Sequence, residues 1–181
     1  MNIRITAALL VSGFALACQP PTTTERLGLE PVETVDGLEL DRYLGLWFEI
    51  GSYPTSFQEG CSETTAEYSL RDDGDIEVLN NCTVDGKPTE AIGVARAVDL
   101  DAGKLEVSFF GPFFGDYWVV ELGEEDGADA PYSYAVVTSP SRDFLWVLSR
   151  DETMDDETLD GIFERLAEQT IDRDRFVMTK R

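Results

Sequence analysis

The chain has 181 residues, a length that suits one domain, and it contains no histidine. Its net charge of −22 excludes a phosphate-binding surface, so we expect no nucleic-acid partner and a self-repelling monomer or weak dimer. Without histidine the chain lacks the most common general base and the most common zinc ligand, which argues against an enzyme and leaves no metal site or other cofactor to expect.

The chain begins with a targeting segment. Residues 1–17 combine one cation, Arg4, with an apolar run, and this pattern predicts a signal peptide. The run is too short for a stable transmembrane helix, which needs about 20 residues. Residues 18–35 contain three prolines and a threonine run with little to bury, so they predict a tether.

A lone cysteine, Cys18, stands where the signal peptide ends. The stretch Ala15-Leu16-Ala17-Cys18 resembles the bacterial lipobox, which implies that Cys18 is acylated and anchors the chain to a membrane. An ordinary secretory peptide with a spare cysteine is the alternative. Gln19 follows instead of Asp, so the resemblance implies sorting to the outer membrane.

Two further cysteines, Cys61 and Cys82, flank a predicted β-hairpin whose turn is Asp72-Asp73-Gly74. Folding the hairpin brings the cysteines near opposite ends of adjacent strands. An exported protein meets an oxidising compartment, so we expect a disulfide if the register or a bulge allows it. Two free buried thiols are the alternative, and a metal site would lack both histidine and a third nearby cysteine.

After the tether the chain shows short strand-like segments separated by turn residues, the pattern of an antiparallel meander. The eight expected strands are 46–52, 64–70, 75–80, 90–98, 104–110, 117–122, 132–138 and 144–150. Residues 153–170 place apolar side chains at helical spacing and predict an amphipathic helix that covers the barrel wall. Residues 175–179 predict a short last strand that pairs with the first.

Eight meandering strands can close into a barrel that holds one small ligand. The predicted fold class is therefore all-β: an eight-stranded antiparallel up-and-down β-barrel with a C-terminal α-helix and a short terminal strand. The barrel domain is expected to span residues 36–181.

Two motifs bring this order of elements close to a known family. Gly45-Leu46-Trp47 opens the first strand, and Arg150 ends the eighth. With these motifs the chain resembles the lipocalins, most of all the bacterial outer-membrane lipoprotein lipocalins and their apolipoprotein D-like relatives, through residues 68–74, 107–113 and 143–150. The resemblance implies that Trp47 closes the barrel floor and that Arg150 stacks across it.

Alternation of side chains across a sheet selects the residues that face the lumen. Arg150 fixes the eighth strand, polar neighbours orient the fifth, and Glu121 orients the sixth. The predicted ligand-binding residues are Tyr68, Val78, Val107, Phe109, Trp118, Val120, Trp146 and Leu148. The alternation assigns no Asp or Glu to the lumen.

An apolar lumen suits binding, storage or transport of a small hydrophobic ligand without catalysis. The resemblance implies that this ligand is a fatty acid or lysophospholipid, and that the protein is anchored through Cys18 on the periplasmic face of the outer membrane. Two alternatives stay open. An enzyme of isomerase or de-epoxidase type would need an acid in the lumen with a raised pKa. A structural envelope lipoprotein would have a barrel filled by its own side chains.

Overall fold

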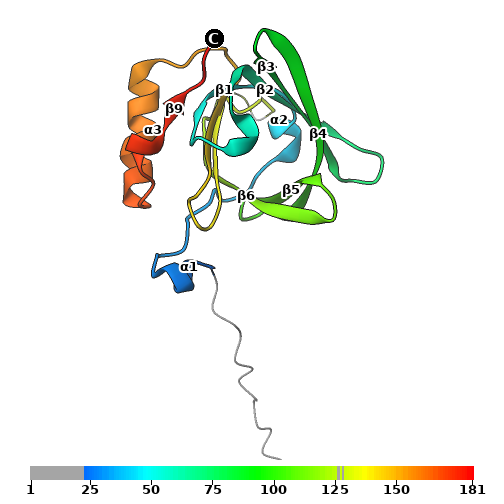
Figure 1. Cartoon of the computed structure of the whole chain (residues 1–181). Coiled ribbons are helices and arrows are strands. Elements are labelled where there is room, and N and C mark those ends of the chain that lie inside the picture. Colours follow the sequence, from blue (N-terminus) through cyan, green and yellow to red (C-terminus); the bar gives the residue numbers. More distant parts are fainter. Residues whose placement is uncertain (1–22, 126, 128) are drawn as a thin grey trace, which may run out of the picture.

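The computed structural model describes residues 23–125, 127 and 129–181, and in this part of the chain eight antiparallel strands close into a barrel (Figure 1). The sheet runs β2-β3-β4-β5-β6-β7-β8-β1, and β1 pairs with β2 to close it, while β9 adds to the edge of β1. The predicted fold class is confirmed. The strands are β1 (Gly45–Ser52), β2 (Cys61–Leu70), β3 (Ile76–Val84), β4 (Lys87–Asp99), β5 (Lys104–Phe110), β6 (Phe113–Leu122), β7 (Tyr134–Thr138), β8 (Leu145–Ser149) and β9 (Val177–Met178).

Several strands extend beyond the predicted bounds. β4 and β6 begin at least three residues earlier than predicted, because their hairpins stay paired up to short turns. β2 begins three residues earlier because Cys61 and Ser62 still pair with the end of β3. The helices are α1 (Thr23–Leu27), α2 (Leu40–Tyr43) and α3 (Asp156–Glu168), with short 3₁₀ turns η1 (Ser56–Gln58) and η2 (Arg173–Arg175). No helix in the described ranges is both long enough and apolar enough to cross a bilayer.

The C-terminal helix α3 lies against the outside of the barrel (Figure 1). Its predicted apolar stripe, which includes Ile162 and Leu166, packs on outward-facing residues such as Val136 and Val147. Asp155 caps the helix, since its carboxylate accepts a hydrogen bond of 2.8 Å from the backbone N–H of Thr158. This outer core is separate from the core inside the barrel.

The barrel has two unlike ends. We call the end closed by Trp47 and Arg150 the floor, and the opposite end the mouth. The floor end carries the β2–β3, β4–β5 and β6–β7 connections. The mouth carries residues 53–60, which include η1, together with the turns at 85–86 and 111–112 and the loop 139–144.

The segment before β1 runs along the outer wall from the mouth to the floor. At the mouth, the Arg142 guanidinium donates to the Glu30 carbonyl at 2.8 Å. Further along, the Val35 N–H donates to the Val119 carbonyl at 3.0 Å, and Leu38 pairs with Leu100 at the floor. The part of the proposed tether from Glu30 onward is therefore fixed to the barrel. The predicted signal peptide (1–17) and Cys18 lie outside the described residues.

Candidate ligand-binding site

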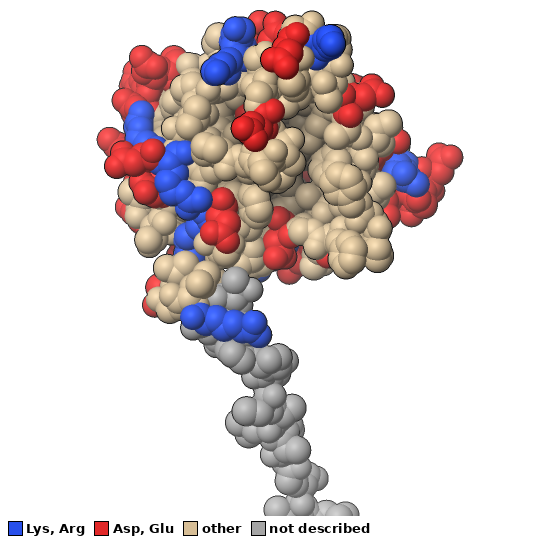
Figure 2. All heavy atoms as spheres, in the orientation of Figure 1, with Lys and Arg blue, Asp and Glu red and all other residues tan. Residues whose placement is uncertain are grey.

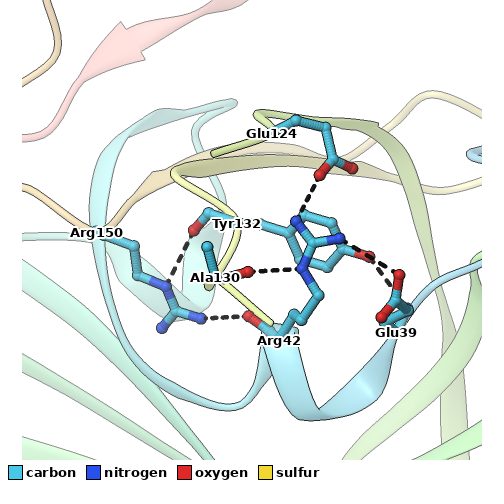
Figure 3. Close-up of polar contacts among 6 residues, drawn as sticks. All are labelled: Glu39, Arg42, Glu124, Ala130, Tyr132 and Arg150. Atoms are coloured by element: carbon cyan, nitrogen blue, oxygen red, sulfur yellow. Dashed lines mark hydrogen bonds and ion pairs between the residues drawn. The ribbon is translucent and has the colours of Figure 1, made fainter. Parts of the chain in front are cut away.

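The floor is built around the first-strand tryptophan. Trp47 is fully buried, and the Arg150 guanidinium carbon lies 3.6 Å from the centroid of its indole ring, as the family resemblance implies. Arg150 also donates to backbone carbonyls of Leu46 (2.6 Å), Arg42 (3.0 Å), Tyr43 (3.1 Å), Leu44 (2.9 Å) and Tyr132 (3.2 Å). Figure 3 shows how Arg150 and Arg42 together fasten the Ala130–Tyr132 segment to α2. Burial lowers the pKa of Arg150, but these acceptors keep the cation in place.

Three tyrosines fill the lower part of the lumen. The hydroxyl of Tyr117, on β6, lies 2.6 Å from that of Tyr43 and 2.8 Å from that of Tyr68. Burial raises the pKa of Tyr68 to about 12, and it raises the pKa of Tyr43 and Tyr117 well above the usual value, so all three are neutral. The neighbouring inward side chains Val78, Leu105 and Leu148 are 2%, 3% and 4% exposed. Such low exposure leaves no room for a ligand at this depth.

The upper part of the lumen is less completely buried. Side chains of the same inward parity, nearer the mouth, are partly exposed, among them Asn80, Val107, Phe109 and Trp146. Gly115 pairs with Val107 on this wall, and a Cβ added to it would meet nothing closer than 4.0 Å. Gly93, on β4, is different, because the Phe109 ring of β5 lies directly over it. A Cβ at Gly93 would lie 2.7 Å from that ring, so only glycine leaves the ring its place. We call this apolar, partly exposed upper part of the lumen the cup.

A buried carboxylate stands at the edge of this cup. Glu49 shares the inward parity of Trp47 on β1 and is 6% exposed. Its oxygens accept hydrogen bonds from Gln58 Nε2 (2.8 Å), Thr179 Oγ1 (2.6 Å) and Ser52 Oγ (3.2 Å). Gln58 Oε1 in turn accepts from the Trp146 indole N–H at 3.0 Å. The chain Glu49–Gln58–Trp146 therefore joins η1 to the lumen wall.

Sequence reasoning did not assign Glu49 to the lumen. The polar–apolar pattern of β1 hides it, because Phe48 and Ile50 on the outer side are as apolar as Trp47 on the inner side. The sequence did contain one indication: Glu49 follows Trp47 by two residues, and residues two apart on a strand face the same side of the sheet.

The eight predicted ligand contacts separate into three groups. Val107, Phe109 and Trp146 lie on the wall of the cup. Tyr68, Val78 and Leu148 also face inward but belong to the packed lower part. Trp118 and Val120 belong to the outer core beside α3, so the prediction that they face the lumen is wrong.

A β-bulge explains the error on β6. Pairing with β7 shifts between Val119 and Glu121, so Val120 has no partner of its own. Glu121 does point outward, and Arg165 of α3 contacts it at 2.5 Å. The extra residue, Val120, reverses the inward and outward alternation for the residues of β6 that precede it. Tyr117 and Val119 therefore face inward, while Trp118 lies outside under the Lys104 ammonium, 4.6 Å from the ring centroid.

A disulfide joins β2 to β3 at the mouth. Cys61 and Cys82 are bonded, with their Cα atoms 5.4 Å apart, so the predicted pairing is present. A register shift between Ser62 and Thr65 accompanies it. The bridge fixes the mouth end of the hairpin whose floor end carries Tyr68.

A closed eight-stranded barrel with a cation–π floor, a wall helix and an apolar cup defines a lipocalin-type barrel. The comparisons agree with this class. The Lipocalin-like domain family matches residues 38–181, and the chain belongs to that family. It is 42% identical to the outer membrane lipoprotein Blc of Vibrio cholerae, over 82% of this chain and 85% of the relative.

More distant relatives share the domain. The chain is 31% identical to apolipoprotein D of Macaca fascicularis, over 80% of this chain and 77% of the relative. Insecticyanin from Manduca sexta superposes with a TM-score of 0.67 at 21% identity, over 84% of this chain and 86% of that one, which shows the fold alone. The resemblance to the bacterial lipoprotein lipocalins and their apolipoprotein D-like relatives is confirmed.

Proposed function

We propose that the chain binds a small single-chain amphiphile, a fatty acid or lysophospholipid, and stores or transports it in the bacterial envelope without changing it chemically. One observation supports the proposal: the inward side chains are mostly apolar, and they are partly exposed near the mouth but closely packed below it. Such a cup accepts a hydrocarbon tail, each buried CH₂ contributing about 0.8 kcal/mol. A structural protein with a completely filled barrel would have no reason to leave its upper wall exposed.

The polar end of the ligand would lie nearer the mouth than its tail, beside the side chain of Asn80. The side-chain oxygen of Asn80, on the inward side of β3, is buried and accepts no hydrogen bond from the described residues. Such an orphaned acceptor is costly unless a donor reaches it. A glycerol hydroxyl of a lysophospholipid would supply that donor, whereas an ionised fatty acid would not.

A binding role fits the arrangement around Glu49 better than an enzymatic one. An isomerase of this fold would aim an acid at the ligand, but the Glu49 oxygens already accept from three side chains. The carboxylate thus serves to hold η1 and β9 against β1.

For location, we propose the periplasmic face of the outer membrane, with the chain anchored through an acylated Cys18. The lipobox-like sequence supports this, as does the similarity to proteins named outer membrane lipoproteins. Acidic side chains are spread over the face shown in Figure 2, in keeping with a barrel body that stays in water.

Tryptophan fluorescence tests the binding proposal, because the three tryptophans occupy different places. Titration with dodecanoic acid or lauroyl-lysophosphatidylcholine should give a saturable change that comes from Trp146, in the cup. Trp146→Phe should remove most of that change, and Trp118→Phe, on the outer wall, should leave it. The absence of a saturable change in a folded protein, judged by near-ultraviolet circular dichroism, would contradict a container.

A further inference from the structure

In the part of the chain that the structure describes, exposed phenylalanine is confined to the mouth of the barrel. Among the described residues four phenylalanines are more than one-third exposed: Phe57 (65%), Phe110 (82%), Phe113 (79%) and Phe144 (38%). They come from three separate connections, and all three connections lie at the mouth. We call these four residues the aromatic rim. Large exposed aromatic groups are costly in water, so their gathering at one end calls for a partner.

The rim has two parts on different sides of the cup. Phe57 and Phe144 lie 6.3 Å apart between ring centroids, and Phe144 stacks on Trp146 at 5.7 Å. Phe110 and Phe113 face each other across the tip of the β5–β6 hairpin, beside the exposed Pro112. The two parts border the opening through which a ligand would pass.

The described part of the N-terminal segment meets the barrel at the same end. Glu30 is held at the mouth by Arg142, in the loop that also carries Phe144. α1 lies outside the barrel on the side of β5 and β6 (Figure 1). Cys18 precedes Glu30 by twelve residues, which at about 3.5 Å each span at most roughly 40 Å. Because the chain first meets the barrel at the mouth, an acyl chain on Cys18 favours the mouth as the end nearest the membrane surface.

We propose that the aromatic rim docks into the lipid bilayer that holds the anchor, so that the cup opens directly onto that bilayer. The rim supplies apolar side chains for the interfacial region, and the barrel body stays in water because of its acidic surface. The net charge of −22 gives no attraction to anionic lipid, so docking depends on aromatic insertion and responds little to salt. A ligand could then pass between bilayer and cup without crossing water.

The test measures membrane binding without the acyl anchor. The Cys18→Ser chain is mixed with vesicles of phosphatidylcholine and phosphatidylethanolamine, and bound protein is measured by flotation. The parent should float with the vesicles at 0.1 M and at 0.5 M salt. Phe110→Ser combined with Phe113→Ser should lower the partition coefficient about 100-fold, roughly tenfold for each phenylalanine withdrawn from the bilayer.

A matched pair at the floor serves as the control. Leu70 and Val98 are 56% and 63% exposed at the opposite end, so Leu70→Ser combined with Val98→Ser removes two exposed apolar side chains away from the mouth and should change partitioning less than about twofold. If the rim pair fails to fold, Phe57→Ser repeats the test in a different loop of the mouth. Each variant is first checked for ligand binding by the Trp146 titration, so that loss of docking is distinguished from loss of the cup.

Two results would overturn the proposal. The first is that the parent chain does not float with the vesicles, or that the rim pair and the floor pair of substitutions reduce flotation equally. The second is that another copy of the chain, rather than the bilayer, covers the aromatic rim. Sedimentation would then show a dimer that the rim pair of substitutions abolishes, while flotation of the parent stays negligible.

Discussion

Arg150 holds more of the barrel floor than any other described side chain. Its guanidinium reaches five backbone carbonyls, four between Arg42 and Leu46 and one at Tyr132, and it covers the Trp47 indole. A planar group with five N–H donors suits this role, whereas an ammonium group could reach only some of the same acceptors.

Replacing Arg150 therefore tests the floor at a single residue. We expect Arg150→Ala to lower the free energy of unfolding by about 3 kcal/mol, because several part-buried carbonyls lose their donor. Arg150→Lys keeps the charge but not the fork, so it should recover less than half of that loss. Urea denaturation measures both, and a lysine variant as stable as the parent would show that charge alone stabilises the floor.

At the scale of elements, the sequence predicted the eight strands, the wall helix and the terminal strand, because alternation and turn residues are local signals. It also predicted which face of β8 and β5 looks inward, where regular pairing preserves parity. It failed on β6, because the bulge at Val120 arises from pairing with β7 and leaves no mark in the local pattern. The depth of the cup was equally hidden, since it depends on Tyr43, from α2, meeting tyrosines of β2 and β6.

The disulfide between β2 and β3 gives a prediction at the same scale. The bridge closes a loop of 21 residues, for which the chain-entropy account gives about 3 kcal/mol. Cys61→Ser combined with Cys82→Ser should lower the free energy of unfolding by that amount and leave the floor and the Trp146 titration unchanged. The control is the parent treated with a reductant, which should unfold at the same urea midpoint as the double serine variant. Equal stability of oxidised and reduced protein would mean that the bridge adds nothing to the paired hairpin.

For the whole molecule, the two halves of the lumen predict a limit on ligand length. The tyrosine cluster fills the lower lumen, where the Tyr43 and Trp47 ring centroids lie 5.2 Å apart, so methylenes beyond a certain chain length must stay outside. Affinity for saturated fatty acids or lysophospholipids should therefore rise with chain length and then level off. A barrel open down to Trp47 would instead show continued gain with each added CH₂.

Shortening the central tyrosine should move that limit. Tyr117→Ala opens space below the cup, so burial of two more methylenes, about 1.6 kcal/mol, should raise the affinity for a 16-carbon chain relative to a 12-carbon chain more than tenfold. The variant should also be less stable by about 3–5 kcal/mol, because a large buried side chain is lost. Tyr117→Phe keeps the ring and removes only the hydroxyl, so it should retain the parent's chain-length profile. If both variants kept the parent profile, the limit would lie elsewhere in the barrel and the tyrosines would serve only to stabilise the fold.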